Sequence, residues 1–183
     1  MRQRQRAMIN NSRIINVPEL ERIVIGVDPA ITANASSNET GIIVAGKCRR
    51  GQYYILNDVS LKGSPLEWAS AVEREYKRWK ADRVICEVNN GGSLVTDNLR
   101  NVNPNISCKS VTASRGKIAR AEPIAALYEQ GKVHHVGTFS KLEDQLCSYN
   151  PAMIQASPDR LDALVWALSE LSSGYGGCRA ILA

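Results

Sequence analysis

The sequence lacks the features of a membrane protein, a secreted protein or a disulfide-bonded fold. No apolar run approaches the ~20 residues that cross a bilayer. The start, Met-Arg-Gln-Arg-Gln-Arg, has no apolar segment behind it and is not a secretory signal. The cysteines number five and no pair has C-x-x-C spacing, which argues against a disulfide framework or a structural zinc site. We therefore expect reduced, mostly buried thiols in a cytoplasmic protein.

Several catalytic signatures are also missing. The chain has no Walker A motif, no discernible Ser–His–Asp arrangement, and only two histidines, which are adjacent at positions 134 and 135. The glycine-rich segment 174–177 does not follow a strand pattern, so it is not a dinucleotide fingerprint. The Gly-Thr phosphate-binding pattern of sugar-kinase-like ATPases is absent as well. These absences argue against a P-loop ATPase, a serine hydrolase and a dinucleotide-binding enzyme.

What is present is one basic domain of ordinary size. The chain has 183 residues, of which 44% are hydrophobic and 22% are charged, with a net charge of +5. This charge is compatible with a polyanionic partner, but many proteins this basic bind none, and charge alone favours a solvated surface over a binding site. The basic residues form two sets, an N-terminal one (Arg2, Arg4, Arg6, Arg13) and a later one (Arg115, Lys117, Arg120).

The order of apolar patterns predicts an α/β fold. Residues 1–20 read as a polar, basic arm, either flexible or docked, with regular structure beginning at Arg22 and a domain over 21–175. Strands at 22–28, 40–46 and 52–58 are joined by short connections, which predicts an antiparallel meander.

After the meander the pattern alternates between helix and strand. A capping box at Ser64 begins a helix, and the strand 84–88 follows it, which implies a parallel crossover. Helices are predicted at 93–100, 118–130, 141–147 and after Ser157-Pro158, strands at 107–111 and 133–136, and a tail at 176–183. We therefore expect a central mixed sheet of five strands or slightly more, flanked by helices in the ribonuclease H-like order. A doubly wound fold normally follows its first strand with a helix.

Three carboxylates suggest the chemistry. Asp28 and Glu87 each end an apolar strand, and Asp162 lies one turn into the last helix among apolar neighbours. If the strands at 22–28 and 84–88 are neighbours, both strand-end acids emerge at one edge of the sheet. Two-metal phosphodiester cleavage needs oxygen ligands that hold hard cations ~3.5–4 Å apart. Aspartate and glutamate are suitable ligands for Mg²⁺ or Mn²⁺.

Each acid also has a structural interpretation. Asp28 is typical of a residue that caps the following turn, and Asp162 of a helix acid paired with a nearby base. Glu87 has fewer structural uses after Val-Ile-Cys. Asp159 lies in the first helical turn, where a negative charge suits the macrodipole, and on the same face as Asp162. It is either a cap or an auxiliary metal ligand.

The motifs, in their order along the chain, resemble the nuclease domain of the large terminase subunit of tailed bacteriophages. The resemblance covers residues 14–172. It rests on Val24-Ile-Gly-Val-Asp-Pro-Ala with Glu39-Thr-Gly-Ile-Ile-Val-Ala-Gly, on Cys86-Glu-Val-Asn-Asn-Gly-Gly-Ser-Leu-Val, on residues 113–131 with Leu142-Glu-Asp-Gln-Leu, and on Ser157-Pro-Asp-Arg-Leu-Asp-Ala-Leu-Val-Trp-Ala-Leu.

The resemblance implies a ribonuclease H-like endonuclease that cuts concatemeric double-stranded viral DNA at the start and end of packaging. It implies two divalent cations, Mg²⁺ or Mn²⁺, held by the catalytic acids Asp28, Glu87 and Asp162, with Asp159 as a further metal ligand. The basic residues Arg115, Lys117 and Arg120 correspond to a segment near the DNA backbone.

The implied partners are a packaging ATPase domain, a small terminase subunit and the portal, in the cytoplasm of a bacterial host and without a membrane. We expect a monomer in isolation. The sequence departs from the family at two points: Asn38 stands where an acid is expected, and the Walker motifs of the ATPase domain are absent. The second departure is that expected of an isolated domain, a split gene or a prophage remnant, so translocation is not predicted. Two other functions stay open, a non-catalytic module that docks DNA or the portal, and a junction-resolvase-like nuclease of the same fold.

Overall fold

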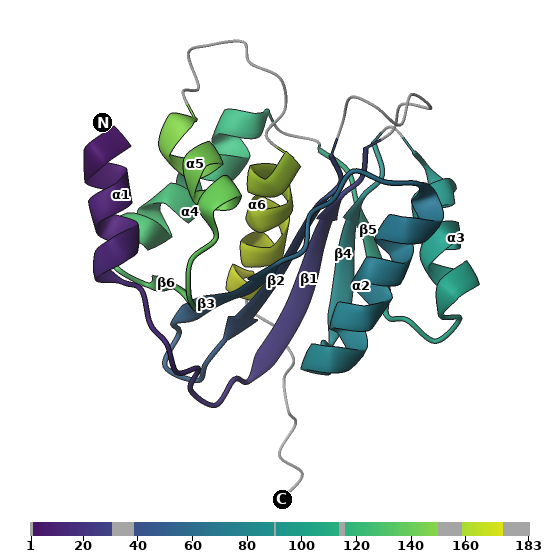
Figure 1. Cartoon of the computed structure of the whole chain (residues 1–183), viewed down its shortest axis with the longest axis horizontal. Helices are drawn as coiled ribbons and strands as arrows, with labels where there is room; N and C mark the ends of the chain where they lie inside the picture. The colour runs from purple at the N-terminus through teal and green to yellow at the C-terminus, as the bar shows by residue number, and fades with distance from the viewer. Residues whose placement is uncertain (1, 31–38, 90, 114–115, 150–158, 174–183) are drawn as a thin grey trace, which may run out of the picture.

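A six-stranded mixed sheet separates two layers of helices in the computed structural model (Figure 1). The structure describes residues 2–30, 39–89, 91–113, 116–149 and 159–173. The strands are β1 (Arg22–Asp28), β2 (Gly41–Lys47), β3 (Tyr53–Asp58), β4 (Arg83–Glu87), β5 (Cys108–Val111) and β6 (Val133–His135). The helices are α1 (Arg2–Asn11), α2 (Pro65–Trp79), α3 (Ser93–Val102), α4 (Lys117–Glu129), α5 (Ser140–Ser148) and α6 (Asp159–Ser172). The predicted start of the last helix at Ser157-Pro158 lies outside the described residues.

The strand order is β5-β4-β1-β2-β3-β6. Strands β1, β2 and β3 form the predicted antiparallel meander. Strand β4 pairs with β1 in parallel, β5 with β4 in parallel, and β6 with β3 in parallel. Each parallel pairing follows a connection that contains a helix, as a crossover requires. The predicted α/β fold with a mixed sheet is confirmed, and the segment at 133–136 supplies the sixth strand.

Each face of the sheet has its own core. Successive residues of a strand point to opposite faces, so Val24 belongs to the core beneath α4, α5 and α6, and Ile25 to the core beneath α2 and α3. Figure 1 shows α2 and α3 on one side of the strands and α1, α4, α5 and α6 on the other. None of the helices in the described ranges is long and apolar enough to span a membrane.

The helix between β3 and β4 begins where the sequence predicts. The Ser64 side chain accepts a hydrogen bond from the Glu67 backbone N–H, and the Glu67 carboxylate accepts one from the Ser64 backbone N–H. Pro65 occupies the first helical position, where its missing N–H is harmless. The capping box therefore fixes α2 in the position that brings the chain back to β4 beside β1.

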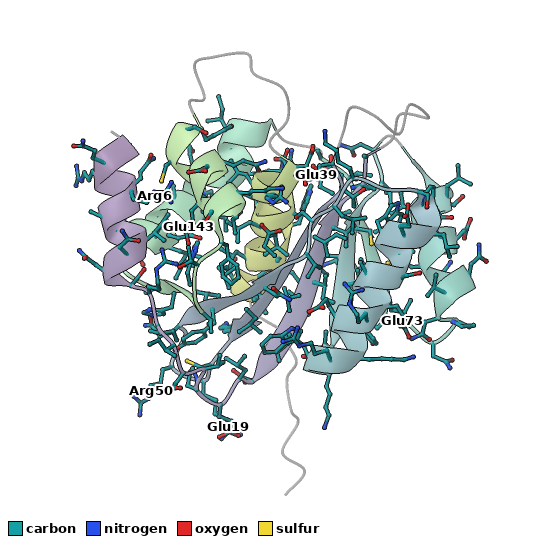
Figure 2. All side chains as sticks on the ribbon, in the orientation of Figure 1. Arg6, Glu19, Glu39, Arg50, Glu73 and Glu143 are labelled. Carbon is teal, nitrogen blue, oxygen red and sulfur yellow. The ribbon has the colours of Figure 1, made fainter. Side chains whose placement is uncertain are left out.

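The N-terminal segment is a correction to the sequence-based expectation, which placed the first regular structure at Arg22. Residues Arg2–Asn11 form a helix that packs on α5 and α4. Ile9 is buried, and Arg6 and Arg13 bind Glu143 of α5 at 3.1 and 2.7 Å. Figure 2 shows Arg6 and Glu143 facing each other. The segment has no capping motif and little apolar character, so tertiary ion pairs rather than local propensity hold the helix in place.

Glu143 lies in a buried polar network with His135 of β6. Its carboxylate also contacts His135 Nδ1 at 3.2 Å, and His135 Nε2 lies 2.8 Å from the Tyr128 hydroxyl. Burial lowers the pKa of His135 to about 4, against the opposing effect of Glu143. Burial also tends to raise the pKa of Glu143, but hydrogen bonds from Arg13, the Phe139 N–H and His135 outweigh it and lower that pKa to about 2. At neutral pH the histidine is therefore neutral and the glutamate ionised.

Two glycines let α6 lie directly on the sheet. A Cβ at Gly26 of β1 would overlap the carbonyl oxygen of Ala163, and a Cβ at Gly41 of β2 would overlap the carbonyl of Asp159. Both obstacles are backbone atoms, which cannot move without displacing the helix. The two glycines therefore set the height of α6 above β1 and β2, one turn apart along the helix.

We predict that Gly26→Ala lowers the free energy of unfolding by about 3 kcal/mol, because the added methyl group pushes α6 off the sheet. Urea denaturation monitored by circular dichroism measures the change. The matched control is Gly116→Ala, whose Cβ would enter open space. Equal stability of Gly26→Ala and the wild type would show that α6 is not seated on β1 in this way.

We predict that His135 makes stability depend on pH between about 6.5 and 4. Over this range the unfolded chain takes up a proton that the folded protein excludes, so the free energy of unfolding falls as the pH falls, by at most about 1.4 kcal/mol per unit. His135→Gln should remove this part of the slope in urea titrations at several pH values. His134→Gln is the control, since it leaves the Glu143 network intact. An unchanged slope in His135→Gln would contradict the assignment.

Candidate active site

Asp28 and Glu87 lie next to each other at the carboxyl ends of two adjacent parallel strands. In the β1–β4 register Val27 is opposite Cys86, so the next residues along the two strands are Asp28 and Glu87. Neither side chain is fully exposed. The backbone therefore places both strand-end acids at one edge of the sheet, as the strand pattern predicts.

Helix α6 begins over the same edge. The carbonyl of Asp159 lies against Gly41, which is the register partner of Asp28. Asp162 is buried, with 6% of its surface exposed, and lies one turn before Trp166 on the same helical face. Because the indole of Trp166 reaches Glu87, this face of α6 is turned toward β4. Asp162 thus lies at the end of the sheet that carries the two strand acids.

The Glu87 carboxylate is held by two neutral donors. Trp166 Nε1 donates to Glu87 Oε2 at 2.7 Å, and Asn89 Nδ2 donates to Glu87 Oε1 at 2.8 Å. Asn89 is itself fixed, because its side-chain oxygen accepts a hydrogen bond from the Ala113 backbone N–H at 2.8 Å. Strand β4, helix α6 and the loop after β5 therefore all converge on this one carboxylate.

A cation accompanies the same carboxylate. Arg120 of α4 places Nη1 at 3.8 Å from Glu87 Oε2, and its guanidinium lies 4.5 Å from the centre of the Trp166 ring. The Arg120 side chain is only 11% exposed. Its Nε and Nη1 atoms are buried without a hydrogen-bond partner. The predicted DNA-binding arginine is thus packed against the acidic edge rather than spread on the surface.

The other two basic candidates are not placed by the structure. Arg115 lies outside the described residues, and the side chain of Lys117, the first residue of α4, is not described. Lys117 precedes Arg120 by three residues, which puts the two on one face of α4.

A second arginine anchors the start of α6. Arg160 is buried and forms ion pairs with Glu39 and, through Nε at 2.8 Å, with Asp58 at the end of β3. Figure 2 shows Glu39 at the end of the sheet where α6 begins. Burial lowers the pKa of Arg160, but its hydrogen bonds and attraction to the two carboxylates raise it further, so the guanidinium stays charged. This contact fixes Asp159 and Asp162 beside the strand ends.

The oxygen donors at this edge are of the kind that hard divalent cations prefer. Within the described parts of the chain, however, no three acidic, histidine or cysteine side chains are gathered closely enough to hold one ion together. Glu87 points instead to Trp166 and Asn89. The residues therefore fit a metal by donor chemistry and by strand placement, and their side chains would have to rotate to share one.

The other sequence features serve the fold. Three of the four described cysteines are buried, and all four are free thiols, as expected. His135 is buried in the Glu143 network, and His134 stacks on Tyr54. Glu143 binds Arg6 of α1 and Arg13, which follows that helix, so its motif anchors the N-terminal segment.

Residues 25–171 match the model of a known family, described as the terminase RNase H-like domain. The chain belongs to the terminase RNase H-like domain family. A comparison with curated protein sequences gives no match. The family assignment agrees with the mixed sheet and with the resemblance seen in the sequence.

Solved structures of terminase nucleases share the fold of this terminase domain. The large terminase nuclease from thermophilic phage G20c with bound zinc superposes with a TM-score of 0.68 at 12% identity, over 91% of this chain and 98% of that chain. Structures of the same nuclease with bound magnesium and with bound cobalt also match. The HK97 bacteriophage large terminase gives 0.66 at 9% identity, over 93% of this chain and 43% of that chain.

A resolvase has a related fold. The yeast mitochondrial Holliday junction resolvase Ydc2 superposes with a TM-score of 0.51 at 12% identity, over 90% of this chain and 83% of that chain. At such identities these likenesses show that the terminase domain shares their fold, and they show nothing about individual residues.

Sequence reasoning did not find the residues that surround Glu87. Trp166 lies four residues after Asp162, and this i, i+4 spacing was the available signal that the indole shares the face of that acid. The ion pair of Arg160 with Glu39 joins residues far apart in the sequence, so no local sequence pattern predicts it.

We predict that Arg160→Met destabilises the terminase domain by about 3 kcal/mol, because it leaves the Glu39 and Asp58 carboxylates without their buried countercharge. Chemical denaturation measures the loss. Arg74→Met is the control, since Arg74 is exposed and its closest ion pair is long, at 3.6 Å. A loss no larger than that of the control would show that Arg160 does not anchor α6.

Proposed function

We propose that this domain is a metal-dependent DNA endonuclease that hydrolyses phosphodiester bonds with two divalent cations, Mg²⁺ or Mn²⁺. The observation that carries the proposal is the adjacent register of Asp28 and Glu87 at the carboxyl ends of β1 and β4, with Asp162 on α6 at the same end of the sheet. Membership of the terminase RNase H-like domain family supports it.

In this proposal Asp28, Glu87 and Asp162 hold the cations and Asp159 is a further ligand. When bound, two cations would activate the attacking water and stabilise the leaving oxygen. The chain itself supplies negative charge at a fixed edge, with Asp28 and Glu87 held by the strand ladder and Asp162 by the seating of α6. Because carboxylates at one edge repel each other, binding of a cation would also relieve that repulsion.

The substrate in the proposal is double-stranded DNA. The net charge of +5 favours a polyanion, and Arg115, Lys117 and Arg120 follow one another closely in the sequence between β5 and the first turns of α4. Of the three, Arg120 lies beside Glu87. Contacts of this kind go to phosphates and position the duplex without reading bases. Cleavage should therefore show weak sequence preference, and binding should fall steeply as salt is raised.

The biological setting proposed is cutting of concatemeric viral DNA during packaging in the cytoplasm of a bacterial host. The structural likeness to the large terminases of phages G20c and HK97 supports it. The partners in this setting would be a packaging ATPase domain, a small terminase subunit and the portal.

A second candidate is a non-catalytic module that docks DNA or a packaging partner. It is favoured by one observation, that the side chains in the described parts of the chain do not form a ready three-ligand metal cluster. Calorimetry distinguishes the two, because intact DNA affinity without any binding of Mn²⁺ supports the docking module and contradicts the nuclease.

We predict that the purified domain with Mn²⁺ nicks and linearises supercoiled plasmid. Asp28→Ala, Glu87→Ala and Asp162→Ala should each reduce the rate about 100-fold or more, since loss even of outer-sphere support weakens metal sites by 10–100-fold. Gel electrophoresis over time measures the rates.

The matched control is Asp97→Ala on α3, an exposed acid on the opposite face of the sheet whose loss should leave the rate unchanged. A folded wild-type protein inert with both metals on plasmid would refute the proposal. Cleavage confined to four-way junctions would indicate a resolvase-like substrate instead.

A further inference from the structure

The environment of Arg120 is unusual for an arginine. Its guanidinium is almost buried, stacks on Trp166 at 4.5 Å, and lies 3.8 Å from Glu87, which is beyond hydrogen-bond distance. Nε and Nη1 have no hydrogen-bond partner. Both donors are fully covered and yet unused.

Unsatisfied buried donors are rare in folded proteins, and each calls for an explanation. Arginine presents its N–H groups as a planar fork that matches two oxygens of a phosphate. The unused donors of Arg120 therefore suit an anion that would draw the side chain outward. Since the present position leaves these donors unsatisfied, moving to such an anion would lose little hydrogen bonding at Nε and Nη1 and gain new bonds.

The same side chain affects the nearest acid. Glu87 is held by Trp166 and Asn89, and the positive charge of Arg120 lies beside its Oε2 atom. A cation at 3.8 Å satisfies part of the negative charge that a metal would otherwise neutralise, and it repels a metal approaching the same oxygen. Arg120 therefore disfavours loading of Glu87 with a metal for as long as it stays in place.

We propose that Arg120 is a positioning residue that holds Glu87 in a resting arrangement with Trp166, and that a phosphate of bound DNA withdraws Arg120 and releases Glu87 to the metals. This inference rests on the proposed nuclease function. DNA binding and metal binding then strengthen each other, because coupling between two sites is reciprocal. The domain would bind its cations tightly when DNA is bound and weakly when DNA is absent.

The test uses Ca²⁺, a hard cation that also binds oxygen ligands, and isothermal titration calorimetry with and without a short DNA duplex. In the wild type the duplex should tighten the dissociation constant for Ca²⁺ about tenfold. Arg120→Met should bind Ca²⁺ about tenfold more tightly than the wild type without DNA, and the duplex should change its affinity less than about twofold.

The matched control is Arg100→Met. Arg100 of α3 lies at the same 3.8 Å from a carboxylate, that of Asp97, on the opposite face of the sheet. The Arg100→Met variant loses the same charge as Arg120→Met, and its affinity for Ca²⁺ with and without the duplex should equal that of the wild type. A second variant, Trp166→Phe, keeps the charge of Arg120 but removes the indole N–H bond to Glu87 and part of the ring on which Arg120 stacks, so it should also tighten Ca²⁺ binding without DNA. Thermal unfolding checks that each variant is folded.

The outcomes separate this inference from the proposed function. Ca²⁺ binding that Asp28→Ala abolishes, combined with no tightening in Arg120→Met or with unchanged coupling to DNA, overturns the role of Arg120 and leaves the nuclease standing. Should Arg120→Met fail to fold, absence of tightening in Trp166→Phe overturns it equally. No cation binding by any variant, together with an uncut plasmid, overturns both.

Discussion

The close contact of α6 with β1 and β2 is the constraint on which the rest of the structure depends. Gly26 and Gly41 have no side chains, so the backbone of the helix rests against the strands where any Cβ would collide with Ala163 or Asp159. The contact has two consequences. It closes one of the two cores with a helix that is buried on almost every side, and it brings the first turn of that helix to the ends of β1 and β4.

The acidic edge follows from that contact and from strand pairing. Register alone puts Asp28 beside Glu87, and only the seating of α6 adds Asp162 to them. The ion pairs of Arg160 with Glu39 and Asp58 hold the start of the helix against the meander. The three acids of the candidate site are therefore carried by the strand ladder and by a fixed helix, and rigid elements position side chains more accurately than loops do.

Local patterns in the sequence were sufficient for the meander, the capped α2 and the strand-end acids, because each depends on alternation or on a cap a few residues long. They failed for α1, because that helix packs through buried Ile9, and Arg6 within it and Arg13 just after it bind a glutamate more than a hundred residues away. They also gave no sign of Arg120 stacked on Trp166. Contacts of this kind depend on which faces of distant helices meet, and that is a property of the assembled fold.

The two arginines at this edge, Arg160 and Arg120, differ in how fully their N–H groups are hydrogen-bonded. Arg160 donates hydrogen bonds to two carboxylates and a carbonyl, and each of its three nitrogens takes part. Arg120 faces one carboxylate at a longer distance and keeps two buried donors unused. Buried charge is stable only where it is paired and hydrogen-bonded, so the arrangement around Arg120 is the less settled of the two. Arg120 can therefore form new hydrogen bonds to an incoming anion, whereas Arg160 would have to break existing ones. In our proposal, the edge thus combines Arg160, a countercharge that stabilises the fold, with Arg120, a countercharge that a phosphate of DNA would withdraw from Glu87.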